Sequence, residues 1–403
     1  MGNRLPLIST QLGRMMALMK KLIAVLISLL IPVSTTTFAF ADALPARFII
    51  TGSGFGHGVG LSQVGARGLA LEGKSASDIL TYYFPGTQIT TAPVTQSIRV
   101  NIAHQSTYQA ITGSNLQLYR GDGTTSPITV AQGATLKFAM VGKMISPTIT
   151  MKGAPTVVIS SGPLFTVKWD GTIKVAGISL KYGSVALRAV ASKMEVTTTM
   201  LLDTEYLYGI SEMSSAWPQA AIASQAIASR TYGLAHSATI RKECDCNVYN
   251  TIYDQNYVGY SKESEPTIGA MWKAAVDATS GMSITYNGAP INVYFFSSSG
   301  GMTQRSEDVW GSAYPYLVSV PDPYSLDLVL NPSYAHWQRV INQKDMSAAF
   351  GLPDVATLAV DARTLTNSVI SVTATSSSGV KMSLPVGIFK TKVKIPASWF
   401  QIN

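Results

Sequence analysis

The chain has 403 residues, of which 46% are hydrophobic and only 13% are charged, and its formal net charge is +8. This mild positive charge is not clustered, which excludes the basic patch that a nucleic-acid-binding protein needs. The length is sufficient for one large hydrophobic core or two ordinary ones. Because the sequence has only two cysteines, Cys244 and Cys246, no framework of disulfides holds the fold together.

Residues 1–41 have the pattern of a secretory signal peptide. Four basic residues precede an apolar run at 22–33, and Ala39 and Ala41 stand where a signal peptidase would cut. The apolar run is too short to span a bilayer, and no later stretch is long and apolar enough to do so. We therefore expect an exported protein that has no membrane span once the signal is removed.

The next two segments differ in their periodicity. Residues 46–90 predict a strand, tight glycine turns and two short helices, because apolar residues recur at helical spacing between positions 69 and 80. Residues 97–185 consist of short runs rich in Val, Ile and Thr, separated by turn signals such as Gly121-Asp122-Gly123. This pattern predicts a small all-β module.

The longest predicted helix lies in the following segment, residues 186–325. It covers residues 218–235 and opens with Pro218 at a favoured first position. Its run of Ala and Ile leaves almost no polar face, which is typical of a buried helix. A second helix is expected near residues 268–279, with β runs around 284–296.

The tail, residues 326–403, returns to a β-rich pattern. Strands are predicted at residues 369–374 and again at 387–389. Taken together, the segments predict a mixed α+β fold in which residues 46–90 and 186–325 form one domain. The 97–185 module is inserted between them, and the tail completes the domain.

Several common catalytic motifs are absent from the sequence. The glycines of residues 54–60 (GFGHGVG) alternate, so the third glycine of a dinucleotide fingerprint is missing, and no GxxxxGK[ST] or HExxH occurs. The nucleophile elbow GxSxG also fails, because Val64 stands where its second glycine belongs. Nucleotide-binding, zinc-protease and α/β-hydrolase functions are therefore disfavoured.

Four other segments together resemble the SpoIID (stage II sporulation protein D) family, which includes amidase-enhancer relatives. The first is the glycine-histidine segment at 54–66 (GFGHGVGLSQVGA). The second runs from 206–218 (YLYGISEMSSAWP) through 225–232 (QAIASRTY). The third is 254–260 (DQNYVGY), and the fourth joins 295–301 (FFSSSGG) to 309–311 (VWG). The resemblance leaves the β module and the tail outside it.

The chain departs from the family pattern in two respects. The glycine-histidine segment precedes the other motifs, whereas many members carry it near the C-terminus. Ala220 and Ala223 occupy helix positions where relatives often have Glu and Lys. These changes put any role for that charge pair in doubt but leave Glu212 in place.

The resemblance implies a lytic transglycosylase that cleaves the glycan strands of peptidoglycan to 1,6-anhydromuramic acid products. Glu212 stands at the position of the single acid/base. The substrate's own 6-hydroxyl is the nucleophile, so one carboxylate suffices where ordinary glycosidases need two. Burial would raise the pKa of this carboxyl and a nearby helix N-terminus would lower it. Alternatively, Glu212 caps or pairs near the helix start.

The remaining predicted substrate-binding residues each have a structural alternative. His57, and less strongly Ser62 and Gln63, bind sugar hydroxyls, help to hold the Glu212 pocket, or are satisfied within a tight turn. Arg230 is expensive to bury unpaired, so it meets Glu212, a structural carboxylate such as Asp254, or an acidic substrate group. The rest line the groove or belong to the core: Gln225, Ser299 and Trp310.

Two interpretations of the cysteines are possible. His236, Cys244 and Cys246 would form a three-ligand zinc site, as the resemblance allows, but no fourth ligand can be named. Free or disulfide-bonded cysteines are the alternative, since export permits a disulfide. The proposed reaction requires no cofactor.

Two functions follow from the resemblance. The first is an exported, cell-wall-associated or secreted transglycosylase, whose partners are peptidoglycan glycan strands. The second is a non-catalytic peptidoglycan-binding enhancer of a separate cell-wall amidase. A retained Glu212 favours the enzyme.

Overall fold

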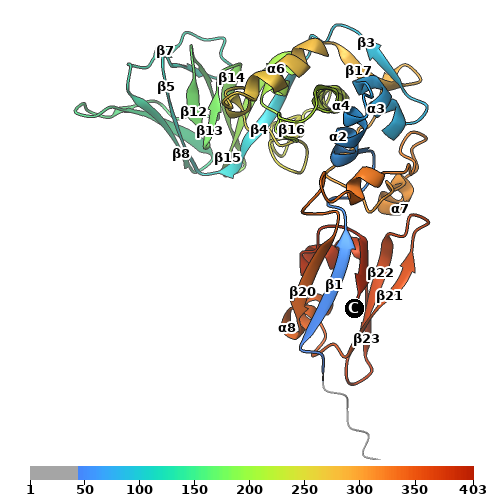
Figure 1. Ribbon diagram of the computed structural model, residues 1–403. Coiled ribbons are helices and arrows are strands. Elements are labelled where there is room, and N and C mark those ends of the chain that lie inside the picture. Colours follow the sequence, from blue (N-terminus) through green and yellow to red (C-terminus); the bar gives the residue numbers. More distant parts are fainter. Residues whose placement is uncertain (1–43) are drawn as a thin grey trace, which may run out of the picture. The chain divides into compact units, whose positions relative to one another are not determined.

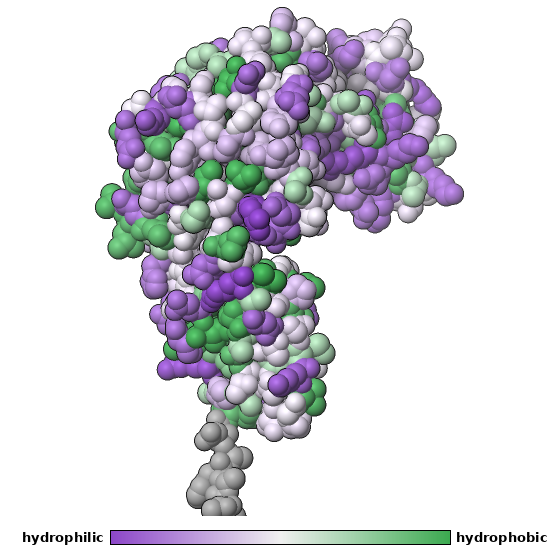
Figure 2. Space-filling model, turned by 90° about the vertical axis from the view of Figure 1, so that its right-hand side faces the viewer, coloured by the Kyte–Doolittle hydropathy of each residue, from purple (hydrophilic) through white to green (hydrophobic). Residues whose placement is uncertain are grey.

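The computed structural model describes residues 44–403 (Figure 1). The predicted signal peptide at 1–41 lies outside the described residues. The described chain contains both helices and strands, with a long run of consecutive strands between residues 88 and 201, which is consistent with a mixed α+β fold. No helix among the described residues is long and apolar enough to cross a membrane. On the face that Figure 2 shows, hydrophobic residues occur in separate patches among hydrophilic ones.

The tail packs together with the first strand of the described chain. Strand β1 (Arg47–Ser53) is the centre of a three-stranded sheet, between β20 (Trp337–Asn342) and β24 (Trp399–Ile402). Both partners run antiparallel to β1. The other elements here are α8 (Gln343–Phe350), β21 (Thr357–Arg363), β22 (Val369–Thr375), β23 (Lys381–Pro385) and α9 (Val386–Val393).

The predicted strand at 387–389 is wrong, because these residues belong to helix α9. Pro385 is the N-cap of that helix, and Phe389 is fully buried in a core that it shares with Phe350 and Phe400. A short apolar run does not distinguish a strand from a buried helix turn, and tertiary packing decides it. The strand predicted at 369–374 is confirmed as β22.

The middle of the chain forms two sheets, which are antiparallel except for one parallel strand, β16, at the edge of the larger sheet. The larger has the order β16-β4-β15-β14-β11-β6-β7, and the smaller has the order β10-β9-β8-β5-β12-β13. Their strands are β4 (Ser97–Ser106), β5 (Tyr108–Gly113), β6 (Gln117–Arg120), β7 (Ile128–Thr129), β8 (Thr135–Val141), β9 (Met144–Thr150), β10 (Val157–Val158), β11 (Leu164–Lys168), β12 (Ile173–Val175), β13 (Ile178–Leu180), β14 (Ser184–Val190), β15 (Lys193–Leu201) and β16 (Val248–Tyr249).

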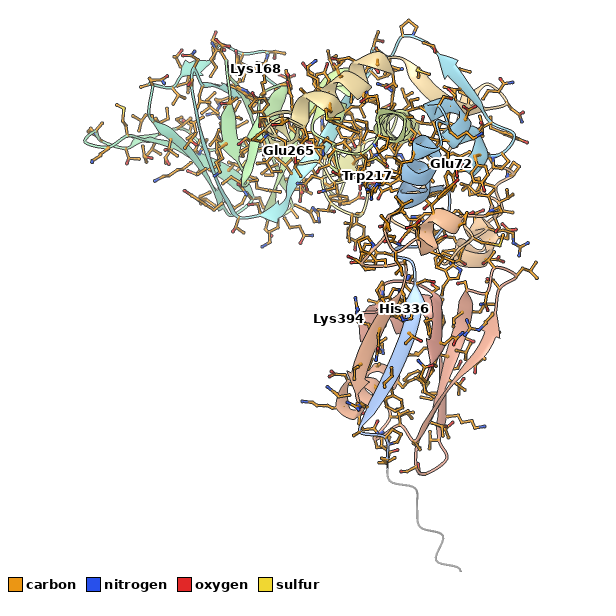
Figure 3. All side chains as sticks on the ribbon, in the orientation of Figure 1. Glu72, Lys168, Trp217, Glu265, His336 and Lys394 are labelled. Atoms are coloured by element: carbon orange, nitrogen blue, oxygen red, sulfur yellow. A yellow bond between two sulfur atoms is a disulfide. The ribbon has the colours of Figure 1, made fainter. Side chains whose placement is uncertain are left out.

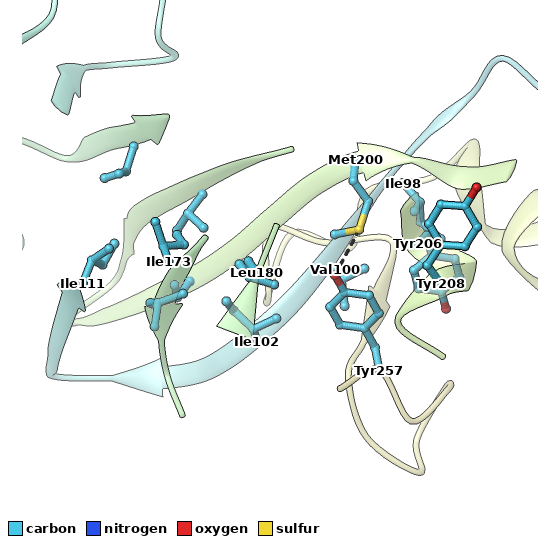
Figure 4. Packing of buried hydrophobic residues seen from close by; sticks show 14 of the residues in the cluster. Ile98, Val100, Ile102, Ile111, Ile173, Leu180, Met200, Tyr206, Tyr208 and Tyr257 are labelled. Atoms are coloured by element: carbon cyan, nitrogen blue, oxygen red, sulfur yellow. Dashed lines mark hydrogen bonds between the residues drawn. The ribbon is translucent and has the colours of Figure 1, made fainter. Parts of the chain in front are cut away.

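The larger sheet does not end at residue 185. Strand β15 continues it to Leu201, and β16 adds a parallel strand beside β4. The hydrophobic core of this sheet extends to Tyr206 and Tyr257 (Figure 4). The hydroxyl of Tyr257 donates to the sulfur of Met200 at 3.2 Å. The β-rich segment therefore shares one core with the chain on either side of Glu212.

A helical part surrounds α4 (Gln219–Ser237), which is buried along most of its length, as its composition predicts. Helices α2 (Gln63–Leu71) and α3 (Ala76–Tyr83) confirm the two short helices expected before residue 90. The remaining elements are β2 (Leu61–Ser62), β3 (Gln88–Thr91), a π-helix η1 (Leu202–Tyr206), α5 (Tyr260–Glu263), α6 (Gly269–Ala278), β17 (Met282–Tyr286), β18 (Ala289–Pro290), β19 (Phe295–Phe296), α7 (Ser306–Trp310) and a 3-10 helix η2 (Pro323–Leu326).

Candidate active site

Segments far apart in the sequence line one cavity of about 630 Å³, which we call the aromatic cavity. Its wall contains four of the residues predicted from the sequence: His57, Gln63, Glu212 and Trp310. The other lining residues are Phe55, Gly56, Ser211, Tyr232, Ile252, Tyr253, Asp254, Asn256 and 293–297. The cavity therefore joins the glycine-histidine segment to the segments around Glu212, Asp254 and Phe295.

The carboxylate of Glu212 is half-buried and has one protein hydrogen-bond donor. The backbone amide of Asn256 donates to Glu212 Oε1 at 2.6 Å. Burial raises the pKa of Glu212 above its ordinary value, and the bond from Asn256 opposes this only in part. The amide of Asn256 thus supplies the counteracting influence that the sequence assigned to a helix N-terminus. A carboxyl with a raised pKa is suited to donate a proton.

The backbone around Glu212 is held from several sides. The side-chain amide of Gln63 donates to the Glu212 carbonyl at 3.0 Å. The ammonium of Lys262 donates to the Met213 carbonyl at 3.1 Å, and that lysine side chain is only 6% exposed. Ser211 and Asn256 exchange two further bonds, each of 2.8 Å. The position of the carboxylate is therefore fixed by groups from two other segments of the chain.

A second carboxylate, Asp254, lines the same cavity in a different setting. It accepts hydrogen bonds from Arg241 at 2.7 and 2.9 Å, from the Tyr232 hydroxyl at 2.5 Å and from the Tyr249 amide at 2.7 Å. Burial alone would raise the pKa of Asp254, but these partners outweigh it and hold the pKa below its ordinary value. The site thus contains one carboxyl that favours its proton and one that remains ionised.

His57 lies between Gly56 and Gly58, whose φ angles of 119° and 87° suit glycine. A Cβ at Gly58 would lie 2.4 Å from the ring of Trp399, so the tail packs directly against this loop. The Val59 amide donates to His57 Nδ1 at 3.0 Å. Burial and the charge of Lys390 lower the pKa of His57 to about 4, against a bond to the Phe295 backbone. His57 is therefore neutral at ordinary pH.

Two of the predicted binding residues lie behind the cavity wall. Gln225 is fully buried; its side chain accepts from Gln63 at 3.2 Å and donates to Ser229 at 3.1 Å. Arg230 is also fully buried, and its charge is paired with Asp203 of the π-helix η1. Its partner is thus a structural carboxylate, but neither Glu212 nor Asp254. Gln225 therefore holds the side chain of Gln63 by a hydrogen bond, and Arg230 has a structural role in the ion pair with Asp203.

The two predicted serines belong to a buried polar network. Ser299 Oγ donates to Asp322 at 2.7 Å, and Ser325 does so at 2.5 Å. Ser62 Oγ lies 3.2 Å from Ser325 Oγ and accepts from the Gly65 amide, which caps helix α2. These hydroxyls connect the glycine-histidine segment to residues 297–325 and do not line the aromatic cavity.

Trp310 is 44% exposed, at the rim of the cavity. Its ring lies 4.5 Å from that of Tyr294 and 5.2 Å from that of His57, measured between centroids. An exposed aromatic face at the rim of a cavity is suited to the apolar face of a sugar ring. The structure therefore places Trp310 where stacking on a substrate is geometrically available.

The zinc ligand set His236, Cys244 and Cys246 is not formed. The two cysteines are joined in a disulfide, and disulfide sulfurs are not the thiolates that zinc requires. His236 Nδ1 lies 2.8 Å from the Tyr232 carbonyl, and its ring stacks on that of Tyr232. Within residues 44–403, no group of three or more potential metal ligands occurs. The donors present do not fit a metal ion at this position.

Sequence reasoning missed several contributors to the cavity. Ile252 and Tyr253 line it although they are 96% and 86% exposed. Lys390, from helix α9, donates to the Gly56 carbonyl at 3.1 Å. Asn256 lies within a recognised motif, but its backbone amide rather than its side chain contacts the Glu212 carboxylate. For Ile252 and Tyr253, the one feature of the sequence that could have predicted a place at the site is their position directly before Asp254. No feature of the sequence around Lys390 predicts its contact with the glycine-histidine segment.

One part of the candidate site matches a known protein family. The family model SpoIID, stage II sporulation protein, matches residues 191–286, which include Glu212 and the Asp254 motif. The amidase enhancer of Bacillus subtilis is 35% identical over 111 residues, covering 28% of this chain and 14% of that protein. The stage II sporulation protein D of Bacillus subtilis is 31% identical over 137 residues, covering 30% of this chain and 38% of that protein.

An uncharacterised protein of Brachyspira hyodysenteriae is 34% identical over 143 residues, covering 34% of this chain and 37% of that protein. The chain thus spans less than two fifths of the length of each of these relatives. The family model covers the segment that carries Glu212 and Lys262 but not Gln63. Residues 191–286 are therefore similar to the SpoIID family, and part of the chain is similar to an amidase enhancer and to stage II sporulation protein D.

Proposed function

We propose that this protein is an exported peptidoglycan lytic transglycosylase that uses Glu212 as its single acid/base. The observation that carries the proposal is the raised pKa of the Glu212 carboxyl in a cavity whose rim offers exposed aromatic rings. The resemblance of the surrounding segment to SpoIID supports the same assignment. The protein would act outside the cell, as a secreted or wall-associated protein.

The reaction needs two proton transfers at one carboxyl group. Protonated Glu212 gives its proton to the glycosidic oxygen, so that the bond from this oxygen to the anomeric carbon of muramic acid breaks. The resulting carboxylate then takes the proton of the muramic acid 6-hydroxyl, whose oxygen bonds to the anomeric carbon. The products are a 1,6-anhydromuramic acid end and a new free 4-hydroxyl, and Glu212 is protonated again.

The surrounding residues would position Glu212 and the sugar. Gln63 and Lys262 fix the backbone on either side of the carboxylate. Trp310 and Tyr294 would stack on a sugar ring. No cofactor enters these steps, because the substrate supplies the nucleophile.

The same proposal extends to domain organisation. Residues 46–90 and 186–325 would form the SpoIID-like catalytic domain, with the β-rich segment at 97–185 inserted and residues 326–403 completing it. The contact of Lys390 with the glycine-histidine loop supports a structural role for the tail at the site.

The alternative is a non-catalytic enhancer of a cell-wall amidase, and one relative carries the name amidase enhancer. To separate the two, purified protein and Glu212→Gln are incubated with peptidoglycan, with and without stem peptides. Soluble products are identified by mass spectrometry. Anhydromuramic acid ends that disappear in Glu212→Gln establish the transglycosylase, whereas reducing ends indicate hydrolysis. Wall binding without products, with full biological effect of Glu212→Gln, indicates the enhancer.

A further inference from the structure

A second cavity, of about 660 Å³, adjoins the aromatic cavity at Ser211 and Glu212. We call it the polar cavity. Ser211 and Glu212 are the residues that line both cavities. Glu212 is therefore located where two cavities of similar size meet, and not at the closed end of one.

The wall of the polar cavity is built from the turn around helix α5. Val258 donates its amide to the Gly209 carbonyl at 2.8 Å, which ties the turn to the backbone just before Glu212. Lys262 reaches the Met213 carbonyl from the same turn. These bonds fix the polar cavity relative to the catalytic candidate, as Gln63 does on the other side.

The polar cavity has a different chemistry from its neighbour. Ser214 and Ser261 are exposed on its wall, and no aromatic side chain lines it. The charge of Lys262 is opposed by that of Glu265, 3.6 Å away. Figure 3 shows Glu265 in the helical part of the molecule that also carries Trp217. Hydroxyls and a compensated charge pair fit a neutral sugar with hydroxyl and amide groups better than an anionic group.

We propose that the two cavities form one groove that holds sugars on both sides of the bond at Glu212, so that the enzyme cuts glycan strands internally. The inference rests on the proposed function. A site at the end of a closed pocket would accept only a strand terminus, whereas a groove that continues past the acid accepts the middle of a strand.

The test fills the polar cavity without touching Glu212. Ser261→Trp places a large side chain on its wall, and Ser264→Trp is the matched control, because Ser264 is exposed on the same turn but does not line the cavity. Long glycan strands labelled at one end are digested, and product lengths are followed from the first minutes. We expect long fragments first with the unsubstituted protein and Ser264→Trp, and at least tenfold slower cleavage with Ser261→Trp.

Disaccharides released from the start, or equal rates for the two tryptophan variants, would overturn the proposal.

A binding measurement tests the groove independently of cleavage. In a Glu212→Gln background, affinity for glycan oligomers should increase until both cavities are filled, and Ser261→Trp should weaken it about tenfold, or about 1.4 kcal/mol. If neither the unsubstituted protein nor its variants cleave glycan strands but this binding pattern is observed, the groove is supported and the transglycosylase assignment is wrong. If affinity stops increasing at the length that fills one cavity, the groove fails.

Discussion

The loop that carries Glu212 and the loop that carries Asp254 bring two carboxylates to one cavity in opposite electrostatic settings. Glu212 receives one backbone hydrogen bond and is otherwise desolvated, so its pKa is raised. Asp254 receives a guanidinium, a phenol and an amide, so its pKa is lowered. The difference shows that the partners of a carboxylate, and not its membership of a cavity, decide whether it holds a proton.

Glu212→Gln tests the proton-donating side of this comparison and should have the largest effect. Loss of a general acid and base lowers the rate about 10²- to 10⁴-fold. The release of soluble fragments from peptidoglycan measures this, with exposed Glu243→Gln as the control. With Glu212 intact, the rate should fall as pH rises through its raised pKa. A variant that cleaves as fast as the control would remove Glu212 from the mechanism.

Asp254→Asn tests the ionised side, through stability. The Asp254 side chain is 2% exposed whereas that of Arg241 is 28% exposed, so loss of the charge-assisted hydrogen bonds should cost about 1–3 kcal/mol of unfolding free energy. Because the folded pKa is lowered, this contribution is present above the ordinary pKa of 3.8 and is lost as pH falls through the folded value. Denaturant unfolding at pH 7 and pH 3 measures it. A gap between Asp254→Asn and the unsubstituted protein that persists undiminished at the lower pH would contradict it.

Removal of the disulfide should lower the stability of the protein less than the loss of Asp254 does. The bridge closes a loop with a sequence separation of 2, so the chain-entropy model gives only about 1–2 kcal/mol. Thermal unfolding of Cys244→Ser/Cys246→Ser against the unsubstituted protein tests this. A chelator should leave both proteins unchanged. Inactivation by a chelator that added zinc reverses would show that a metal is present after all.

Tyr253→Ala sharpens the comparison at the rim. An aromatic ring that is 86% exposed contributes little to the core, so unfolding should not change. Loss of stacking on a sugar should weaken binding of glycan oligomers by about 1 kcal/mol, or roughly fivefold. Leu365→Ala, at a comparably exposed position of the tail, is the control. Equal affinities for the two variants would exclude Tyr253 from the binding surface.

The last prediction is small and has the opposite sign to that for Asp254. The Glu212 carboxyl contributes stability fully below its ordinary pKa of 4.5 and loses it as pH rises through the raised value. Glu212→Gln should therefore melt at a higher temperature than the unsubstituted protein at pH 7, with the difference closing towards pH 4. A lower melting temperature at pH 7 would mean that the site favours the anion.

Local sequence patterns predicted several residues that line the aromatic cavity, because the segments around Glu212 and Asp254 are close together in the sequence. The buried helix α4 followed from composition, and Glu212 followed from its motif. The partner of Arg230 did not, since Asp203 lies in a π-helix that no periodicity marks. The helix at 386–393 was missed for a related reason, because only packing against Phe350 and Phe400 identifies it.

The electrostatic state of His57 also could not be predicted from its neighbours in the chain. Its pKa depends on burial and on Lys390, whose ammonium reaches the loop from helix α9. Burial likewise lowers the pKa of Lys390 itself to about 8. The proximity of His57 and Lys390 arises only when the tail folds against the glycine-histidine segment, so the sequence alone does not predict it.

That contact has a consequence for the order of events during biosynthesis. Gly56 and Lys390 are separated by 334 positions, and β1 pairs with β24 near the far end of the chain. A chain that grows from its N-terminus presents the glycine-histidine loop long before Lys390 has been added. The loop can reach its final geometry only after residues 386–393 have folded against it, so the cavity should be completed late in folding.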